Sequence, residues 1–359
     1  MSAPDGSLSA SLWTSVHAAK TPLNSGSGGG EPGRSPRSGS VPFLVRTDDP
    51  KADTSILTAS ERQTLLGSIT GRDLAILSAL HHYRYLDRGQ LESLFFPSTR
   101  SCQTRLKWLS DHHLAHRWLR LQQPGWRRCD SVLLITPRGA SVLAGHLGVD
   151  AKELVHRSRG ARDHSLYLTH DLEANGFFVA LARASAPIPD QGLYHWVGEE
   201  STRVLYRGRG EAPSPDGWGR YLLPQGEVVF LLEWDRGTQS PQRLRQKISI
   251  YLDHFRGRQD AHLNHVLLVG PNWAREQTIA EATSRLRPAA GAGCRLWTSN
   301  QELLAEAGPL GPVWLDPASP SRRSRLSEFD ARPRSARRVE DSIAKPAWWE
   351  RRPGGGEGA

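Results

Sequence analysis

Residues 215–237, PDGWGRYLLPQGEVVFLLEWDRG, contain one apolar run, VVFLL, that ends in two carboxylates, Glu233 and Asp235. The segment LPQGE between two strand-like arms predicts a β-hairpin in which paired positions sum to about 450. In that register Asp216 lies opposite residues 233–235, and Glu233 and Asp235 share one strand face. An ionised carboxylate inside a fold is costly unless it is neutralised, so these acids require either an arginine or a metal ion.

The elements around this hairpin predict an α/β domain over residues 160–316. A helix is predicted for HSLYLTHDLEANGFFVALARA, and a strand, a loop and a strand for GLYHWVGEESTRVLY. After the hairpin come a helix in SPQRLRQKISIYLDHF, a buried strand in HLNHVLLVG, a helix in REQTIAEATSRLR and a last strand in CRLWTS. Helices and strands in this order favour layers packed around a central sheet.

One lysine stands out beside the acids. The chain has 46 lysines and arginines together, and Lys247 is the only lysine between Lys152 and Lys345. Its place before Ile248 puts it at the edge of the helix face that packs on the sheet. Because a lysine can shift its pKa and orient or activate a water, whereas an arginine stays charged and planar, we interpret the exception as functional.

Residues 58–150 form a separate predicted unit. Helices are expected in GRDLAILSALHHYRYLD, RGQLESLFFP and STRSCQTRLKWLSDHH, followed by strands in LAHRWLRL and SVLLITPRG around the turn QQPGWRRCD, and a last helix in GASVLAGHLG. Three helices and then a β-hairpin is the order of a winged helix, a variant of the helix-turn-helix.

A winged helix inserts its third helix into the major groove and places the hairpin tip near the flanking backbone. Residue types suited to phosphates and base edges occur on both elements. The candidate DNA-binding residues are Arg100, Gln103, Thr104, Arg105 and Lys107 on the helix, and Arg127 and Arg128 at the hairpin tip. The alternative is that such a helix contacts another protein.

The composition and the two ends of the chain bound its class. The 359 residues carry a formal net charge of +9, which favours a polyanion such as double-stranded DNA as partner. Residues 1–57 and 317–359 are rich in Ser, Gly, Pro or Arg and are predicted to be disordered. Three scattered cysteines argue against a zinc site or a disulfide framework, and no membrane span is apparent, so we expect a cytoplasmic protein.

Pro215-Asp216, Glu233-x-Asp235 and a lysine in the next helix resemble the core of the PD-(D/E)XK nucleases. The resemblance implies that Asp216 and Glu233 bind a divalent metal, Mg²⁺ or Mn²⁺, and that Lys247 positions the attacking water. The candidate catalytic residues are Asp216, Glu233, Asp235, Lys247 and the helix-borne Glu173. The sequence departs from the standard pattern because Asp235 occupies the position of the lysine. The alternative is plain ion pairing, Asp235 with Arg236 and Glu233 with Arg203 or Arg243.

A longer resemblance covers roughly residues 58–300. The runs RLKWLSDHHLAHRW, SVLLITPRGASVLA, HSLYLTHDLEAN and FLLEWDRGTQSPQRLRQKISIYLDHF resemble the replication-relaxation proteins of bacterial plasmids and integrative elements. This resemblance implies a DNA-binding role in replication or mobilisation, with other replication or transfer proteins as possible partners. Tyr83, Tyr85 and Tyr251 lie in apolar helical contexts, which argues against a relaxase that uses a nucleophilic tyrosine.

The sequence therefore predicts an α+β protein, with a winged-helix domain at 58–150 and an α/β domain at 160–316 that resembles a restriction-endonuclease-like core. Three functions remain open. The first is a DNA-binding replication-relaxation protein, the second a metal-dependent endonuclease or nickase using Asp216, Glu233 and Lys247, and the third a transcription regulator. The sequence leaves the oligomeric state open.

Overall fold

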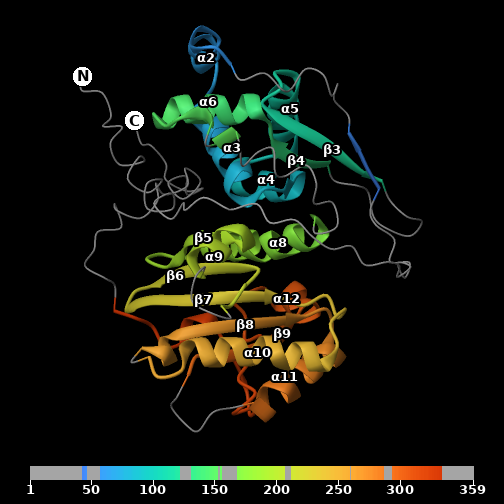
Figure 1. Cartoon of the computed structure of the whole chain (residues 1–359), viewed down its shortest axis with the longest axis vertical. Helices are drawn as coiled ribbons and strands as arrows, with labels where there is room; N and C mark the ends of the chain where they lie inside the picture. The colour runs from blue at the N-terminus through green and yellow to red at the C-terminus, as the bar shows by residue number, and fades with distance from the viewer. Residues whose placement is uncertain are drawn as a thin grey trace, which may run out of the picture.

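The computed structural model of the chain describes residues 43–46, 57–121, 131–152, 154–155, 168–206, 212–258, 260–286 and 293–333. These residues contain helices together with a four-stranded and a seven-stranded sheet, which confirms a mixed α+β protein. Figure 1 shows the helices α2 to α6 gathered around the smaller sheet, and the larger sheet with α8 to α12 below them. No helix among the described residues is both long and apolar enough to cross a membrane.

The N-terminal part has the predicted order of three helices and an antiparallel strand pair. Each of these helices begins at a residue whose side chain accepts a hydrogen bond from a backbone N–H of the first turn, namely Thr70, Asp87 and Ser98. The elements are α2 (Ala59–Leu66), α3 (Gly71–Tyr83), β2 (Leu86–Asp87), α4 (Arg88–Phe95), α5 (Thr99–Asp111), β3 (Ala115–Leu121), β4 (Ser131–Ile135) and α6 (Pro137–Leu147).

The smaller sheet has the order β1-β3-β4-β2. Its first strand, β1 (Phe43–Arg46), pairs antiparallel with β3 and lies inside the region predicted to be disordered. Because these four residues pair with residues 118–121, the prediction of disorder was wrong for them. The rest of residues 1–57, apart from Leu57, lies outside the described residues.

The larger sheet has the order β11-β10-β9-β8-β7-β6-β5. Its strands are β5 (Gly192–Gly198), β6 (Gly217–Leu223), β7 (Gly226–Trp234), β8 (Asn264–Gly270), β9 (Arg295–Asn300), β10 (Trp314–Leu315) and β11 (Arg323–Ser324). Strands β5, β6 and β7 form an antiparallel meander, and β8 and β9 run parallel to β7. Gly217 lies opposite Leu232 and Trp218 opposite Leu231, so the predicted hairpin register is confirmed.

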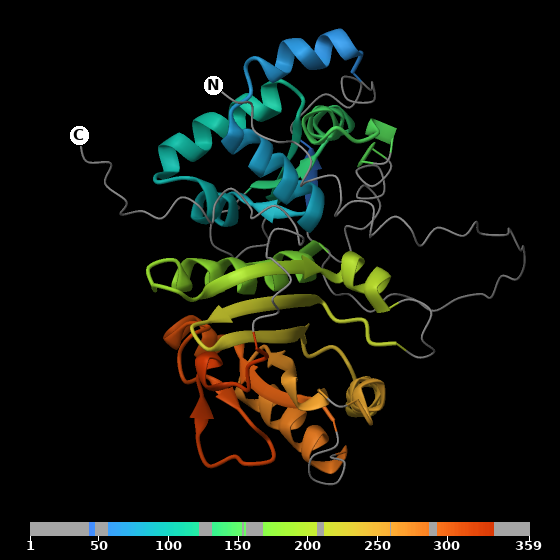
Figure 2. The ribbon, with the colours of Figure 1, turned by 90° about the vertical axis from the view of Figure 1, so that its left-hand side faces the viewer.

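Helices cover both faces of this sheet. On one face lies α8 (Leu168–Ser185), whose Phe177 and Phe178 pack with Phe230. On the other, α10 (Pro241–Phe255) and α11 (Trp273–Leu286) bury a second apolar cluster that includes Leu231 and Ile248. Figure 2 shows these layers from the side. The remaining short elements are η2 (Ala261–Leu263), α12 (Gln301–Ala307) and η3 (Leu326–Glu328).

Residues 199–206 form helix α9 (Glu199–Tyr206), where the sequence predicted a loop and a strand. Glu199 and Arg203 form an ion pair at 2.5 Å with the four-residue spacing that supports a helix. Thr202 donates a hydrogen bond to the backbone oxygen of Glu199 at 2.7 Å and is also within 2.8 Å of the oxygen of Pro215. This helix therefore holds the backbone just before Asp216.

The predicted disordered tail is wrong for residues 317–333. Arg323–Ser324 form β11, and Leu326 and Phe329 are buried in the main apolar core. Phe329 stacks on Trp297 of β9 with ring centroids 4.0 Å apart. The sequence reasoning missed Leu326 and Phe329 because they lie in an arginine-rich segment and belong to no periodic apolar pattern. Residues 334–359 lie outside the described residues.

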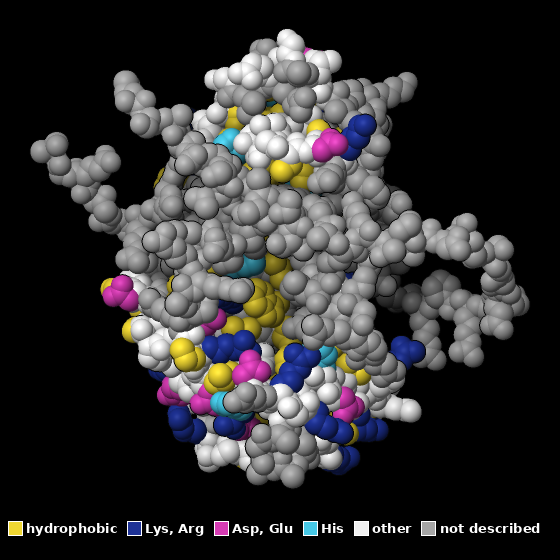
Figure 3. Space-filling view, turned by 60° about the vertical axis from the view of Figure 1, so that its left-hand side comes forward, with side chains coloured by type: hydrophobic (Ala, Val, Ile, Leu, Met, Phe, Trp, Pro, Cys, Tyr) yellow, Lys and Arg dark blue, Asp and Glu magenta, His cyan; other side chains and the backbone are white. Residues whose placement is uncertain are grey.

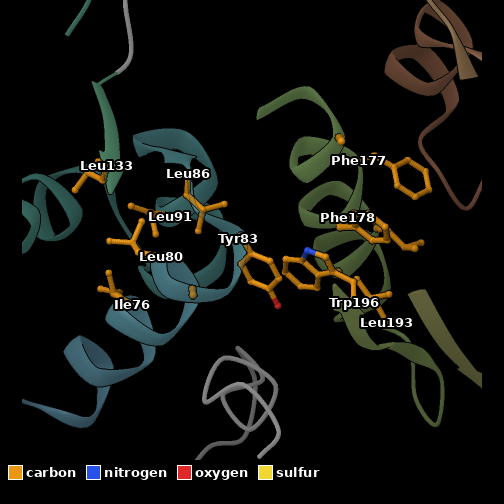
Figure 4. Close-up of a cluster of buried hydrophobic side chains, with 14 of the residues drawn as sticks. Ile76, Leu80, Tyr83, Leu86, Leu91, Leu133, Phe177, Phe178, Leu193 and Trp196 are labelled. Carbon is orange, nitrogen blue, oxygen red and sulfur yellow. The ribbon is translucent and has the colours of Figure 1, made fainter. Parts of the chain in front are cut away.

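The two parts of the molecule share one apolar core. Tyr83, the last residue of α3, stacks on Trp196 of β5 with ring centroids 4.2 Å apart, and Trp196 stacks in turn on Phe178 (Figure 4). Polar contacts fix the same junction, since Asn175 Nδ2 donates to the backbone oxygens of Tyr83 and Tyr85 at 3.1 and 3.0 Å. The helix α8 is thus the element on which the N-terminal part rests.

Candidate functional site

The acids predicted from the hairpin lie at the end of β7, where Glu233 is almost fully buried. Lys247 Nζ forms an ion pair with Glu233 Oε2, and the hydroxyl of Tyr251 donates a hydrogen bond to Oε1. Lys247 and Tyr251 are four residues apart on α10, so both reach the same carboxylate from one helix face. The predicted approach of Lys247 to the acids is present in the structure.

Charge and burial act in opposite directions on this pair. Burial raises the pKa of Glu233, and the charge of Asp216 adds to that effect, although the Lys247 ammonium opposes it. Burial by itself would lower the pKa of Lys247, but the charges of Glu233 and Asp216 outweigh it and raise the pKa. The lysine is therefore held in its charged form as the counter-ion of the acids.

Asp216 precedes β6 and lies next to Glu233 in the register of the hairpin. Its carboxylate accepts a hydrogen bond from the backbone N–H of Trp234 at 2.7 Å and lies 3.3 Å from His170 Nε2 of α8. Burial by itself would raise the pKa of Asp216, but His170 and the charge of Lys247 lower it. Burial likewise opposes the charge on His170, yet Asp216 raises the pKa of this histidine to about 9. The two residues therefore form an ion pair at neutral pH.

Asp235 and Glu173 have partners of their own. Arg275 of α11 contacts Asp235 at 2.5 Å and also donates to the backbone oxygen of Gln239, while the backbone N–H of Gly237 donates to Asp235 at 2.8 Å. Glu173 accepts a hydrogen bond from Trp234 Nε1 at 3.1 Å. Because Trp234 and Glu233 are neighbours in a strand, Glu173 lies across the sheet from Glu233. Glu173 therefore does not join the Lys247 group, whereas the charge of Asp235 is one of those that raise the pKa of Lys247.

The arrangement does not fit a carboxylate metal site as it stands. Among the described residues, no group of three or more His, Cys, Asp or Glu side chains is placed to hold a metal ion. The cavity beside Glu233, Asp235 and Lys247 measures about 20 Å³, which is room for about one water. What the geometry does provide is a buried charge network that ties α8, β6, β7 and α10 together.

Sequence reasoning placed Lys247 near the acids, and the structure pairs it with Glu233. It missed three partners of the acids, His170, Tyr251 and Arg275. The alternative ion pairs were wrong as well, since Glu233 pairs with Lys247 and Asp235 with Arg275. A usable signal existed for Tyr251, because a lysine and a tyrosine four residues apart share a helix face. No local signal marks His170 or Arg275, because each lies on an element far along the chain from its partner.

The second predicted site is the third helix of the N-terminal part, α5. Its residues Cys102, Leu106 and Leu109 are buried, as predicted, and its opposite face leaves Arg100, Gln103, Thr104 and Lys107 exposed. Lys107 forms an ion pair with Asp111 at 2.8 Å. The exposed polar residues on this face remain available for a partner. Arg127 and Arg128 lie outside the described residues.

Arg105 differs from the other predicted DNA-binding residues of α5. Its Nε donates to Oδ1 of the fully buried Asp73 at 2.6 Å, and its guanidinium lies 4.0 Å from the ring centroid of Trp108. Burial by itself would raise the pKa of Asp73, but hydrogen bonds from Arg105 and Thr70 lower it. Arg105 therefore joins α5 to the first turn of α3.

The surface of the larger sheet carries both signs of charge. On the face in Figure 3, the described Lys and Arg side chains of the lower part lie among Asp and Glu side chains. A binding surface for a polyanion usually shows a patch or stripe of one sign. The described residues on this face therefore show no patch of one sign.

The family model described as replication-relaxation matches residues 77–267, more than half of the 359-residue chain. The matched span begins in α3 and ends in β8, so it includes α5 and the charge network around Glu233. No curated protein and no solved structure matches the chain. The span confirms the family that the sequence motifs resembled, and the chain belongs to the replication-relaxation family.

Proposed function

We propose that this protein binds double-stranded DNA and acts in the replication or mobilisation of a plasmid or another mobile element. Membership of the replication-relaxation family supports the biological role. The order α3-β2-α4-α5-β3-β4 supports a winged helix in the N-terminal part, with α5 as the helix that enters the major groove.

The observation that carries the proposal is the two-sided character of α5. Its apolar residues are buried against the N-terminal core, while Arg100, Gln103 and Thr104 face solvent. Side chains of these types form hydrogen bonds with base edges and phosphates. A helix exposed in this way, in a chain of net charge +9, is suited to duplex DNA.

Fluorescence anisotropy tests the proposal. The purified protein is titrated into a labelled duplex from the origin region of its own element and into a duplex of unrelated sequence. We expect tighter binding to the origin duplex, and Gln103→Ala should lower that preference roughly tenfold if the residue reads a base. Arg183→Ala, which removes an exposed charge on α8, is the matched control. A wild-type protein that binds neither duplex would overturn the proposal.

A second candidate function is a metal-dependent endonuclease of the PD-(D/E)XK type. Two observations favour it. Lys247 contacts Glu233, and Asp216 lies beside Glu233 in the hairpin register. The helix, three-stranded meander, crossover helix and parallel strand from α8 to β8 are compatible with such a core. Against it, Asp216 is held by His170, and a cation would have to displace these partners to reach the acids.

Cleavage of supercoiled plasmid tests the second candidate. The wild type is incubated with Mg²⁺, Mn²⁺ or EDTA beside Asp216→Ala, Glu233→Ala and Lys247→Ala. Nicking that needs a metal and is lost in all three variants would establish the nuclease. An uncut plasmid with undiminished DNA binding would leave the acids a structural role.

A further inference from the structure

A groove of about 610 Å³ opens between the first turns of α3 and α5. Three arginines line it, Arg72, Arg100 and Arg105, together with the hydroxyl-bearing side chains Thr70, Ser98, Ser101 and Thr104. Among the described residues, no acidic side chain is part of the lining. The wall of the groove therefore presents cations and hydroxyl groups, a set that suits the oxygen atoms of a phosphate.

The three arginines are engaged to different degrees. Arg105 forms an ion pair with the buried Asp73. This pair fixes the position of the Arg105 side chain and neutralises part of its charge. Arg72 lies over the ring of Phe96 at 5.2 Å, and its buried Nε has no hydrogen-bond acceptor within the described part of the chain. Arg100 is exposed on α5, and no ion pair to it is found among the described residues. Two cationic side chains thus face one groove without a matching acid.

Like charges placed together repel one another unless an anion lies between them. The groove also receives the N-terminal end of α5, a helix of 13 residues, whose partial positive charge adds to that of the arginines. The first turn of α5 carries no acidic residue that would satisfy this charge internally. An anionic ligand is the arrangement that relieves both effects.

We propose that this groove binds a phosphate of the DNA backbone, with Arg72 and Arg100 as the contacting side chains and Arg105 as a positioning residue. The inference rests on the proposed DNA-binding function and adds Arg72, which belongs to α3 and lies outside the predicted recognition helix. The groove sets the depth and orientation of α5 on the duplex, while Gln103 on the exposed face is left to meet base edges. Phosphate contacts of this kind carry no sequence information.

The salt dependence of binding separates a phosphate contact from a base contact. Arg72→Ala and Arg100→Ala are each titrated against the origin duplex and the unrelated duplex at several salt concentrations. We expect each variant to bind both duplexes about tenfold more weakly, and the slope of log K against log salt to fall by about one. Arg72→Lys keeps the charge and should retain most of the slope. Arg183→Ala on α8 should leave the affinity and the slope unchanged.

The outcomes distinguish this inference from the function on which it rests. A wild type that binds duplex DNA, with both alanine variants unchanged in affinity and slope, would overturn the groove and leave the DNA-binding proposal standing. A loss of affinity confined to the origin duplex would also overturn it, because it would mean base reading. A wild-type protein that binds neither duplex would overturn both the DNA-binding proposal and the phosphate-binding groove. Thermal unfolding of each variant verifies its fold, and the exposed Arg100 provides the test should Arg72→Ala unfold.

Discussion

Lys247 of α10 and Glu233 of β7 form an ion pair in which the glutamate side chain is 4% exposed and the lysine side chain 30% exposed. The lysine side chain thus extends from the protein surface to a carboxylate in the core, where its ammonium is the counter-ion. Lys247 lines the small cavity beside the acid together with Ile248, and its ammonium contacts the carboxylate. The pair joins the crossover helix α10 to β7, an interior strand of the sheet.

Replacing Lys247 by Met should destabilise the protein, because Glu233 would keep its buried place without a counter-charge. We expect a loss of about 3 kcal/mol in the free energy of unfolding near pH 7.5, measured by urea denaturation. The pKa of Glu233 is raised to about 8 and should rise further without the lysine, so the loss should grow as the pH increases above about 8. Arg243→Met, an exposed change on the same helix, should alter the free energy by less than about 0.5 kcal/mol.

A double-mutant cycle with Glu233→Gln isolates the interaction from the burial of each side chain. In the double variant neither partner is charged, so it should be more stable than the two single effects together predict. If the changes in the free energy of unfolding are additive, Lys247 and Glu233 have no coupling energy, and their contact does not stabilise the fold.

The pair of His170 and Asp216 makes stability depend on pH. The folded-state pKa of His170 is raised to about 9, above its ordinary value of about 6.5, so the folded protein binds this proton more tightly than the unfolded chain. The stabilisation is therefore complete below about pH 6.5 and is lost as the pH rises through about 9. The shift corresponds to roughly 3 kcal/mol at most.

Unfolding curves between pH 6 and about 9.5 check this relation. The wild type should lose more stability over this range than His170→Gln does. The difference between the two losses measures the stabilisation that protonated His170 contributes. His262→Gln, an exposed histidine, should follow the wild type. Parallel curves for wild type and His170→Gln would contradict the assigned pairing.

The hairpin and the two-sided helices could be read from the sequence because local rules decide them. Turn residues and alternation determined the register that places Gly217 opposite Leu232. Helical spacing identified the buried stripe Cys102, Leu106 and Leu109. These patterns need no knowledge of what packs against the element, and they were confirmed.

The partners of the acids could not be read in the same way. Three acids near one strand end looked like a converging group, but Asp216 turns to His170 on α8, and Asp235 to Arg275 on α11. These helices lie on opposite faces of the sheet, so each acid has its basic partner on a different helix. Which basic side chain reaches which face depends on how distant elements pack, and sequence spacing carries no record of that.

Arg105 should prove to be a stabilising residue rather than a base reader. Arg105→Ala leaves the fully buried Asp73 without its guanidinium, and we expect a loss of about 3 kcal/mol in the free energy of unfolding. Lys107→Ala on the same helix breaks only an exposed pair with Asp111 and should cost about 0.5 kcal/mol or less. Chemical denaturation of both variants measures the contrast. If Arg105→Ala and Lys107→Ala have the same free energy of unfolding, Arg105 does not stabilise the fold and again becomes a candidate DNA-contacting residue.

The segment 317–333 should behave as part of the fold although its composition resembles a tail. Phe329 is 4% exposed and stacks on Trp297, and Leu326 is fully buried beside the same core. Removing the ring in Phe329→Ala leaves a cavity, and large-to-small changes of this kind cost about 3–5 kcal/mol. Ser327→Ala, an exposed change between the two apolar residues, should have little effect. Thermal unfolding compares the two variants. A Phe329→Ala protein with the same unfolding temperature as the wild type would mean that the segment does not stabilise the sheet.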